Sequence, residues 1–249
     1  MSLDPSLPEA NAWRGILATT YEYDWAAATR WFEKAMAFEP VAPRIRHITG
    51  YFHLRFVGRA NEAVTEHERA LREDPLNLIQ RVGLAMSLMS AERYDEAAAE
   101  SRRLRELAPD FPATYTLLTG NVAREPLPTA LEFAERLHTR APWSAGANGL
   151  LAGLLRRAGD EQRAAKLYAG IGDPRVYGHG VDLALYRLAC GDVDAAFEPM
   201  IQLVQQRHPF VMMSSSAART DRCFDHPRVG PRSRVRSVFG NADSTDHAD

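Results

Sequence analysis

The chain has 249 residues, of which 45% are hydrophobic and 25% charged, and its formal net charge is -2 at neutral pH. This balance is ordinary for a folded protein and excludes a chain that is disordered throughout. Because there is no large positive excess, a strongly basic nucleic-acid-binding protein is also excluded.

The N-terminal residues, the longest charge-free stretch and the cysteines do not indicate a secreted or membrane-spanning protein. The N-terminal residues 1–9 lack a basic start followed by an apolar run, so they do not resemble a signal peptide. The longest stretch without charged residues, 141–155, is shorter than the roughly 20 apolar residues of a membrane span. Cys190 and Cys223 cannot form a disulfide framework and have no neighbours at zinc-ligand spacing. These features predict a cytoplasmic protein with no metal and no membrane contact.

Prolines recur along the chain at nearly constant intervals. Subtracting successive positions gives spacings of 35, 35, 34, 33, 32 and 35 residues for Pro5, Pro40, Pro75, Pro109, Pro142, Pro174 and Pro209. A small residue precedes four of these prolines by twelve positions, as Ala28 precedes Pro40. Phe32 and Ala35 follow Ala28 by four and seven positions, which places all three on one helical face. The proline then ends the helix, because it lacks an N–H group.

Short turns divide each proline-bounded unit into two helices. In chain order they are 22–24, 57–60, 91–94, 124–128, 158–160 and 190–192. Gly and Asp favour the backbone conformations of helix caps, so Asp24, Asp160, Asp192 and Asp194 are predicted to cap helices rather than to act as acid–base groups. No alternating apolar–polar run is long enough for a strand. The prediction is an all-α chain of antiparallel helix pairs in about six repeats.

The period, the small residue, the aromatic residue and the closing proline resemble the tetratricopeptide repeat family over residues 3–209. The passages 21–35 and 191–228 further resemble the arrays that follow winged-helix, nucleotide-cyclase or protein-kinase domains in bacterial regulators. The resemblance implies a right-handed superhelical solenoid. His67 and Ser101 depart from it, because they stand where the family prefers an aromatic residue.

The extent of the repeats predicts one helical array followed by a tail. Residues 1–227 are expected to form the array, which begins inside a repeat series rather than with a polar cap. Residues 228–249 have few apolar anchors and are expected to form a flexible tail.

The resemblance also implies a binding groove, because in this family the first helix of each repeat lines the inner surface. The proline register carries the groove positions onto Arg44, His47, Tyr51, Arg55, Val82, Met86, Met89, Arg124, Arg156 and Arg157. Cationic groups around an apolar floor that contains methionine suit an acidic peptide or protein.

No catalytic constellation accompanies these features. A nucleophile, a base and an orienting group cannot be assembled, and there is no His-Glu-x-x-His motif, so neither enzyme activity nor a cofactor is expected. His47 and His53 are interpreted as groove or surface residues, and Gly149 with Gly153 as a close helix contact. The leading hypothesis is a protein-interaction scaffold that does not bind nucleic acid directly. The alternative is the regulatory array of a bacterial transcriptional regulator or nucleotide cyclase whose effector domain lies on another chain.

Overall fold

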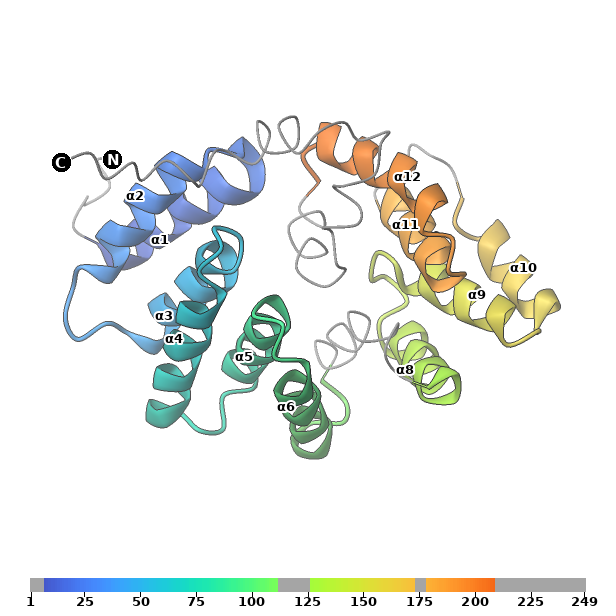
Figure 1. The fold of residues 1–249 in the computed structure, drawn as a ribbon, viewed down its shortest axis with the longest axis horizontal. Helices are drawn as coiled ribbons and strands as arrows, with labels where there is room; N and C mark the ends of the chain where they lie inside the picture. The colour runs from blue at the N-terminus through green and yellow to red at the C-terminus, as the bar shows by residue number, and fades with distance from the viewer. Residues whose placement is uncertain (1–6, 112–125, 173–177, 209–249) are drawn as a thin grey trace. The chain divides into compact units, whose positions relative to one another are not determined.

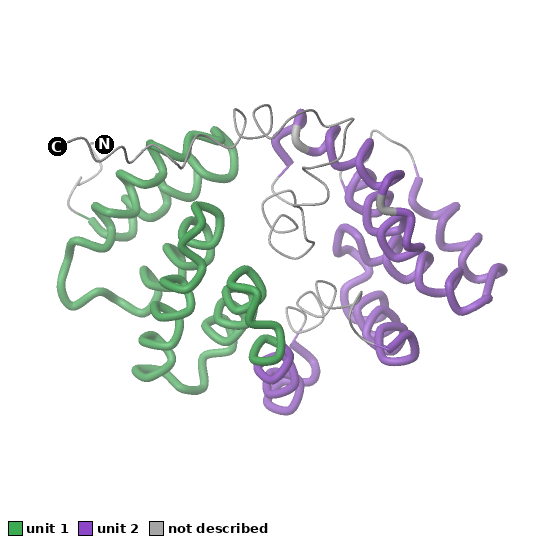
Figure 2. The backbone as a smooth tube through the Cα atoms, in the orientation of Figure 1, with its two compact units in different colours: residues 1–97, 219–249 green, residues 98–218 purple. Residues whose placement is uncertain are grey.

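The structure, a computed structural model, describes residues 7–111, 126–172 and 178–208. Within these ranges every regular element is a helix, which confirms the all-α fold class (Figure 1). The chain divides into two compact units (Figure 2), whose described residues are 7–97 in the first and 98–111, 126–172 and 178–208 in the second. The predicted end of the array at residue 227 and the predicted tail lie outside the described residues.

The first unit contains three helical repeats. The second helix of the third repeat begins in this unit and continues past Ala97, where the unit ends. Its elements are α1 (Pro8–Leu17), η1 (Ala18–Glu22), α2 (Trp25–Met36), α3 (Pro43–Thr49), η2 (Gly50–Leu54), α4 (Ala60–Glu73), α5 (Leu78–Ser90) and the start of α6 (Tyr94–Leu107). The elements η1 and η2 are π-helical turns that continue α1 and α3.

The repeat positions identified from the prolines form the core of the first unit. α1 packs against α2, α3 against α4, and α4 also against α5. Ala28, Phe32 and Ala35 are at most 1% exposed and lie in one cluster with Ile45 of α3. Burying an aromatic side chain such as that of Phe32 contributes roughly 1.5–3 kcal/mol. The predicted face of the second helix is therefore the face that holds the pair together.

The two π-helical turns coincide with the 35-residue spacings of the first two repeats. A π-helical turn closes its hydrogen bonds over five residues instead of four, so it accommodates one extra residue. The intervals from Pro5 to Pro40 and from Pro40 to Pro75 each exceed the 34-residue family period by one. The next interval has 34 residues, and its first helix, α5, contains no such turn. In these two repeats the extra residue therefore lies within the first helix. The interval from Pro174 to Pro209 also has 35 residues, but its first helix α11 is a regular α-helix.

The second unit continues the pattern of helix pairs. Besides the rest of α6 it contains α8 (Leu127–Arg140), α9 (Ala147–Arg157), α10 (Glu161–Ala169), α11 (His179–Ala189) and α12 (Val193–Gln205). α9 packs against α8, α10 and α11, and α11 packs against α12. Gly149 and Gly153 lie where α9 crosses α11, and a Cβ atom on Gly153 would lie 2.6 Å from the Tyr186 carbonyl oxygen. The interpretation of these glycines as a close helix contact is confirmed.

Aspartates begin the second helices as predicted, with one exception. Asp24, Asp160 and Asp192 each accept a hydrogen bond from the backbone N–H three residues later, at 2.8, 3.2 and 3.1 Å. Such caps contribute about 0.5–2 kcal/mol each. Asp194 instead lies inside the first turn of α12, so its prediction as a cap is wrong.

Candidate functional site

One side of α3 and η2 carries three of the predicted groove residues. Arg44, His47 and Tyr51 are spaced three and four residues apart, which aligns them along one helical face. The Arg44 guanidinium lies 6.0 Å from the ring centroid of Trp13 in α1, and the Trp13 side chain is 51% exposed. The rings of His47 and Tyr51 stack with centroids 5.5 Å apart. We call the surface formed by Trp13, Arg44, His47 and Tyr51 the aromatic–cationic face.

Arg55 lies beneath this face rather than on it. Its side chain is 5% exposed, its guanidinium lies 4.8 Å from the Tyr51 ring centroid, and its Nε donates to Ser90 Oγ at 3.1 Å. Burial lowers the pKa of Arg55 to about 10, and Tyr51 partly offsets this shift. The Arg55 guanidinium therefore stays cationic at neutral pH and packs against the Tyr51 ring as a cation–π contact.

The remaining groove residues are distributed between core, surface and the undescribed part of the chain. Val82, Met86 and Met89 are 8%, 6% and 3% exposed in α5, so they contribute to packing. The structure therefore brings four of the ten predicted residues together: Arg44, His47, Tyr51 and Arg55.

Two predicted residues of the second unit are exposed, and one lies outside the described residues. Arg156 and Arg157 are exposed on α9, where Arg156 Nη1 donates to the Tyr186 hydroxyl at 2.8 Å. Arg124 lies outside the described residues. A role of these three arginines in binding stays a prediction.

Three histidines are buried or half-buried at this helix: His47 in α3, His53 in η2 and His67 in the neighbouring α4. The ring of His67, which is fully buried, meets His47 edge to face at 5.2 Å between centroids, and its Nδ1 lies 3.2 Å from Gln80 Oε1. His53 is 2% exposed and stacks on Phe32 at 5.0 Å, so its interpretation as a groove or surface residue is wrong. Burial, with a smaller contribution from neighbouring cationic or imidazole groups, lowers the pKa of His47 and His53 to about 4 and that of His67 to about 3. All three rings are neutral at pH 7.

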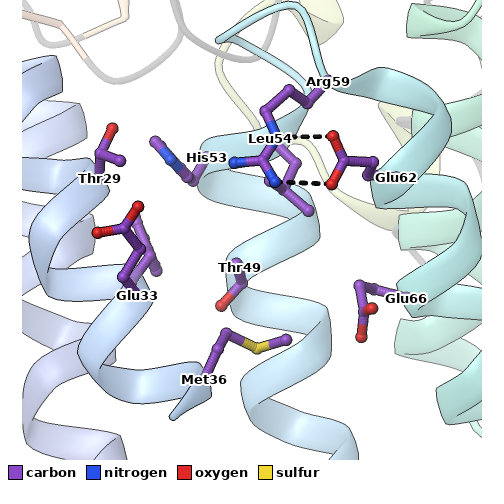
Figure 3. Close-up of a pocket in the computed structure, with 10 residues that line it drawn as sticks. Thr29, Glu33, Met36, Thr49, His53, Leu54, Arg59, Glu62 and Glu66 are labelled. Carbon is purple, nitrogen blue, oxygen red and sulfur yellow. Dashed lines mark hydrogen bonds and ion pairs between the residues drawn. The ribbon is translucent and has the colours of Figure 1, made fainter.

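The opposite side of α3 and η2 borders a cavity of about 180 Å³ (Figure 3). Thr49 and His53 line it, and they are displaced by two residues from His47 and Tyr51, which places them on the other side of the helix. The complete lining is Thr29, Phe32, Glu33, Met36, Thr49, His53, Leu54, Arg59, Glu62 and Glu66. Sequence reasoning missed this cavity. The available signal was the four-residue spacing of Thr49 with His53 and of Glu62 with Glu66.

In the described ranges, no group of three or more His, Cys, Asp or Glu side chains is arranged to hold a metal ion. No helix in the same ranges is long and apolar enough to cross a membrane.

Comparison with known proteins supports the fold. No known family model matches the chain, and no curated protein matches its sequence. A solved structure of PilF from Pseudomonas aeruginosa is similar with a TM-score of 0.56 and 17% sequence identity, over 83% of this chain and 94% of that chain. At this identity the likeness shows the fold alone. The chain therefore has a tetratricopeptide-like fold of packed helix pairs.

Proposed function

We propose that the chain is a non-catalytic interaction scaffold whose aromatic–cationic face binds an acidic segment of a partner protein. The observation that carries the proposal is the exposed pairing of Trp13 with Arg44 from two neighbouring first helices. Tryptophan, tyrosine and arginine are the residues that most often dominate binding energy at interfaces. The face presents all three types.

The charge of this face favours a carboxylate over a cation. Arg44 supplies the exposed charge, and Arg55 adds a buried positive charge below Tyr51. His47 is neutral at pH 7 because burial lowers its pKa to about 4, so it adds a stacking surface without charge. A guanidinium held beside an indole keeps its N–H edge free for bidentate contact with a carboxylate. An acidic segment with an apolar side chain next to the acid complements both features.

The proposal includes two expectations from the sequence, a cytoplasmic location and the absence of catalysis. The chain has only two cysteines, which supports the cytoplasm because that compartment is reducing. In the described part of the chain no feature favours the alternative of a regulatory array serving an effector domain on another chain.

Affinity capture with a matched pair of variants tests the proposal. The wild-type chain, Arg44→Glu and the control Arg72→Glu are immobilised, and bound proteins are identified by mass spectrometry. Arg72 is exposed on α4 of the same unit. We expect Arg44→Glu to lose partners that contain acidic segments and Arg72→Glu to keep them. Identical partner sets for Arg44→Glu and the wild type would contradict the proposal.

A further inference from the structure

The cavity behind α3 and η2 differs from the aromatic–cationic face in charge. Its lining contains the carboxylates of Glu33, Glu62 and Glu66 and a single guanidinium, that of Arg59 (Figure 3). Arg59 holds Glu62 through hydrogen bonds of 2.7 and 2.6 Å.

The two other carboxylates differ in their pairing. Arg46 and Arg69 hold Glu66 at 2.6 and 2.8 Å. Glu33 is exposed and forms no salt bridge among the described residues, although its charge attracts the Arg59 guanidinium at longer range. Among the three carboxylates, Glu33 is therefore the one that no arginine holds in direct contact.

The inner part of the cavity combines apolar walls with two unsatisfied polar atoms. Phe32, Met36 and Leu54 form the apolar walls. Thr49 Oγ1 and His53 Nδ1 are buried without a hydrogen-bond partner, and the two residues are 4% and 2% exposed. A buried polar group without a partner costs about 1–3 kcal/mol, so a ligand that supplies the missing hydrogen bonds gains that energy.

His53 does not repel a cation at neutral pH. Burial and Arg59 lower its pKa to about 4, which keeps the imidazole uncharged. In the neutral ring one nitrogen accepts a hydrogen bond, and its tautomer can adjust to the ligand.

The volume of the cavity and the positions of its hydrogen-bond acceptors indicate which class of ligand fits. A volume of about 180 Å³ is smaller than the roughly 300–1,000 Å³ of small-molecule sites but suits one long side chain. Thr49, His53 and Glu33 offer acceptors from separate positions on two helices. A compact ammonium with three rotatable donors fits separate acceptors better than a planar guanidinium, which prefers a two-oxygen fork.

We propose that this cavity binds a lysine side chain of a partner protein. The aliphatic stem lies against Phe32, Met36 and Leu54, and the ammonium is bound by the Thr49 hydroxyl, the His53 ring and the Glu33 carboxylate. This site is separate from the aromatic–cationic face and does not depend on the function proposed for it. α3 and η2 would then separate two sites of opposite charge preference.

A peptide titration followed by NMR tests the lysine site. Three blocked tripeptides, acetyl-Gly-X-Gly-amide with X as lysine, norleucine or glutamate, are added to the ¹⁵N-labelled full chain. We expect the lysine peptide to shift the amide signals of Thr49 and His53 in a saturable manner. The norleucine peptide keeps the stem but lacks the ammonium, so it loses the contacts to Thr49, His53 and Glu33 together and should bind at least about tenfold more weakly. The glutamate peptide should cause no shift.

Two conservative variants and one control complete the test. Glu33→Gln changes an exposed residue and Thr49→Val removes only the hydroxyl, so each should keep the fold and weaken lysine binding several-fold. Glu68→Gln, on the other side of α4 from Glu66, should bind like the wild type. Equal binding of the norleucine and lysine peptides would overturn the proposal, as would the absence of any saturable shift or unchanged lysine binding in both cavity variants.

Discussion

Gly50 lies beneath the imidazole of His67, and a Cβ atom built on Gly50 would come 2.9 Å from His67 Nε2. The same relationship holds one repeat earlier, where a Cβ on Gly15 would lie 2.8 Å from the ring of Phe32. Both the glycines and the rings are 35 residues apart. In each of these two repeats, therefore, an aromatic ring of the second helix packs directly on the backbone of the first helix.

This contact predicts that Gly50→Ala destabilises the first unit. Alanine improves helix propensity by roughly 0.5–1 kcal/mol, but overpacking against a buried ring costs about 1–3 kcal/mol. Urea unfolding followed by tryptophan fluorescence in a Trp143→Phe background isolates this unit, because the other three tryptophans, at positions 13, 25 and 31, all lie in it. The loss should shrink when His67→Ala removes the ring. A loss of the same size in both backgrounds would refute the contact.

Acid should weaken the first unit through its histidines. The pKa of His47 and His53 is about 4 and that of His67 about 3, below the ordinary value of 6.5. Protons therefore bind the unfolded chain more readily, so the stability that is complete above pH 6.5 is lost as the pH falls towards 4 and below. Thermal unfolding of the Trp143→Phe chain should show Tm falling between pH 6.5 and 4.

His67→Phe provides the control for this pH dependence. It restores the aromatic residue type that Phe32 supplies in the preceding repeat, and it removes the most deeply buried imidazole. The decline of Tm between pH 6.5 and 4 should become shallower than in the chain with His67. An identical decline would mean that His67 does not contribute to the acid sensitivity.

In the second unit, Asp182 should be replaceable by asparagine but not by alanine. Its carboxylate accepts the Gly149 N–H at 2.8 Å, at the start of α9, while burial raises the pKa of this carboxyl above its ordinary value. Because the folded-state pKa is raised, the charged form at pH 7 opposes folding and protonation at lower pH relieves this cost. Asp182→Asn keeps an oxygen acceptor and should unfold at or above the wild-type Tm at pH 7. Asp182→Ala should lose about 1–2 kcal/mol. If asparagine is as destabilising as alanine, the charge itself is required.

Local features of the sequence predicted the helix pairs, the core positions and most caps. Ala28 and Phe32 follow from spacing along one helix, and Asp24 from its place before the next. The groove was harder to predict, because the π-helical turn η2 adds one residue, which rotates later side chains by about 100° relative to a regular helix. Arg55, directly after η2, is therefore buried instead of lining the groove.

The hydrophobic pattern of one helix also cannot predict which of its apolar residues are buried by packing with other elements. Gln80 to Met89 are ten consecutive buried residues of α5, so burial in this helix does not follow a single face. Met86 and Met89 thus appear in the sequence as groove candidates, although they are core residues of the structure. The cavity was missed for a related reason: its lining comes from α2, α3, η2 and α4, and only the packing of these elements brings it together.

The most direct test of the interaction-scaffold account is the affinity of the aromatic–cationic face for a captured acidic segment, measured by calorimetry at low and high salt. Arg44→Glu should weaken binding strongly at low salt and less at high salt, because exposed charges are screened. Trp13→Ala should cost roughly 1–2 kcal/mol at both salt concentrations with Tm unchanged, and Arg72→Glu should bind like the wild type. Wild-type affinity in both Arg44→Glu and Trp13→Ala would contradict the account and move the binding surface away from this face.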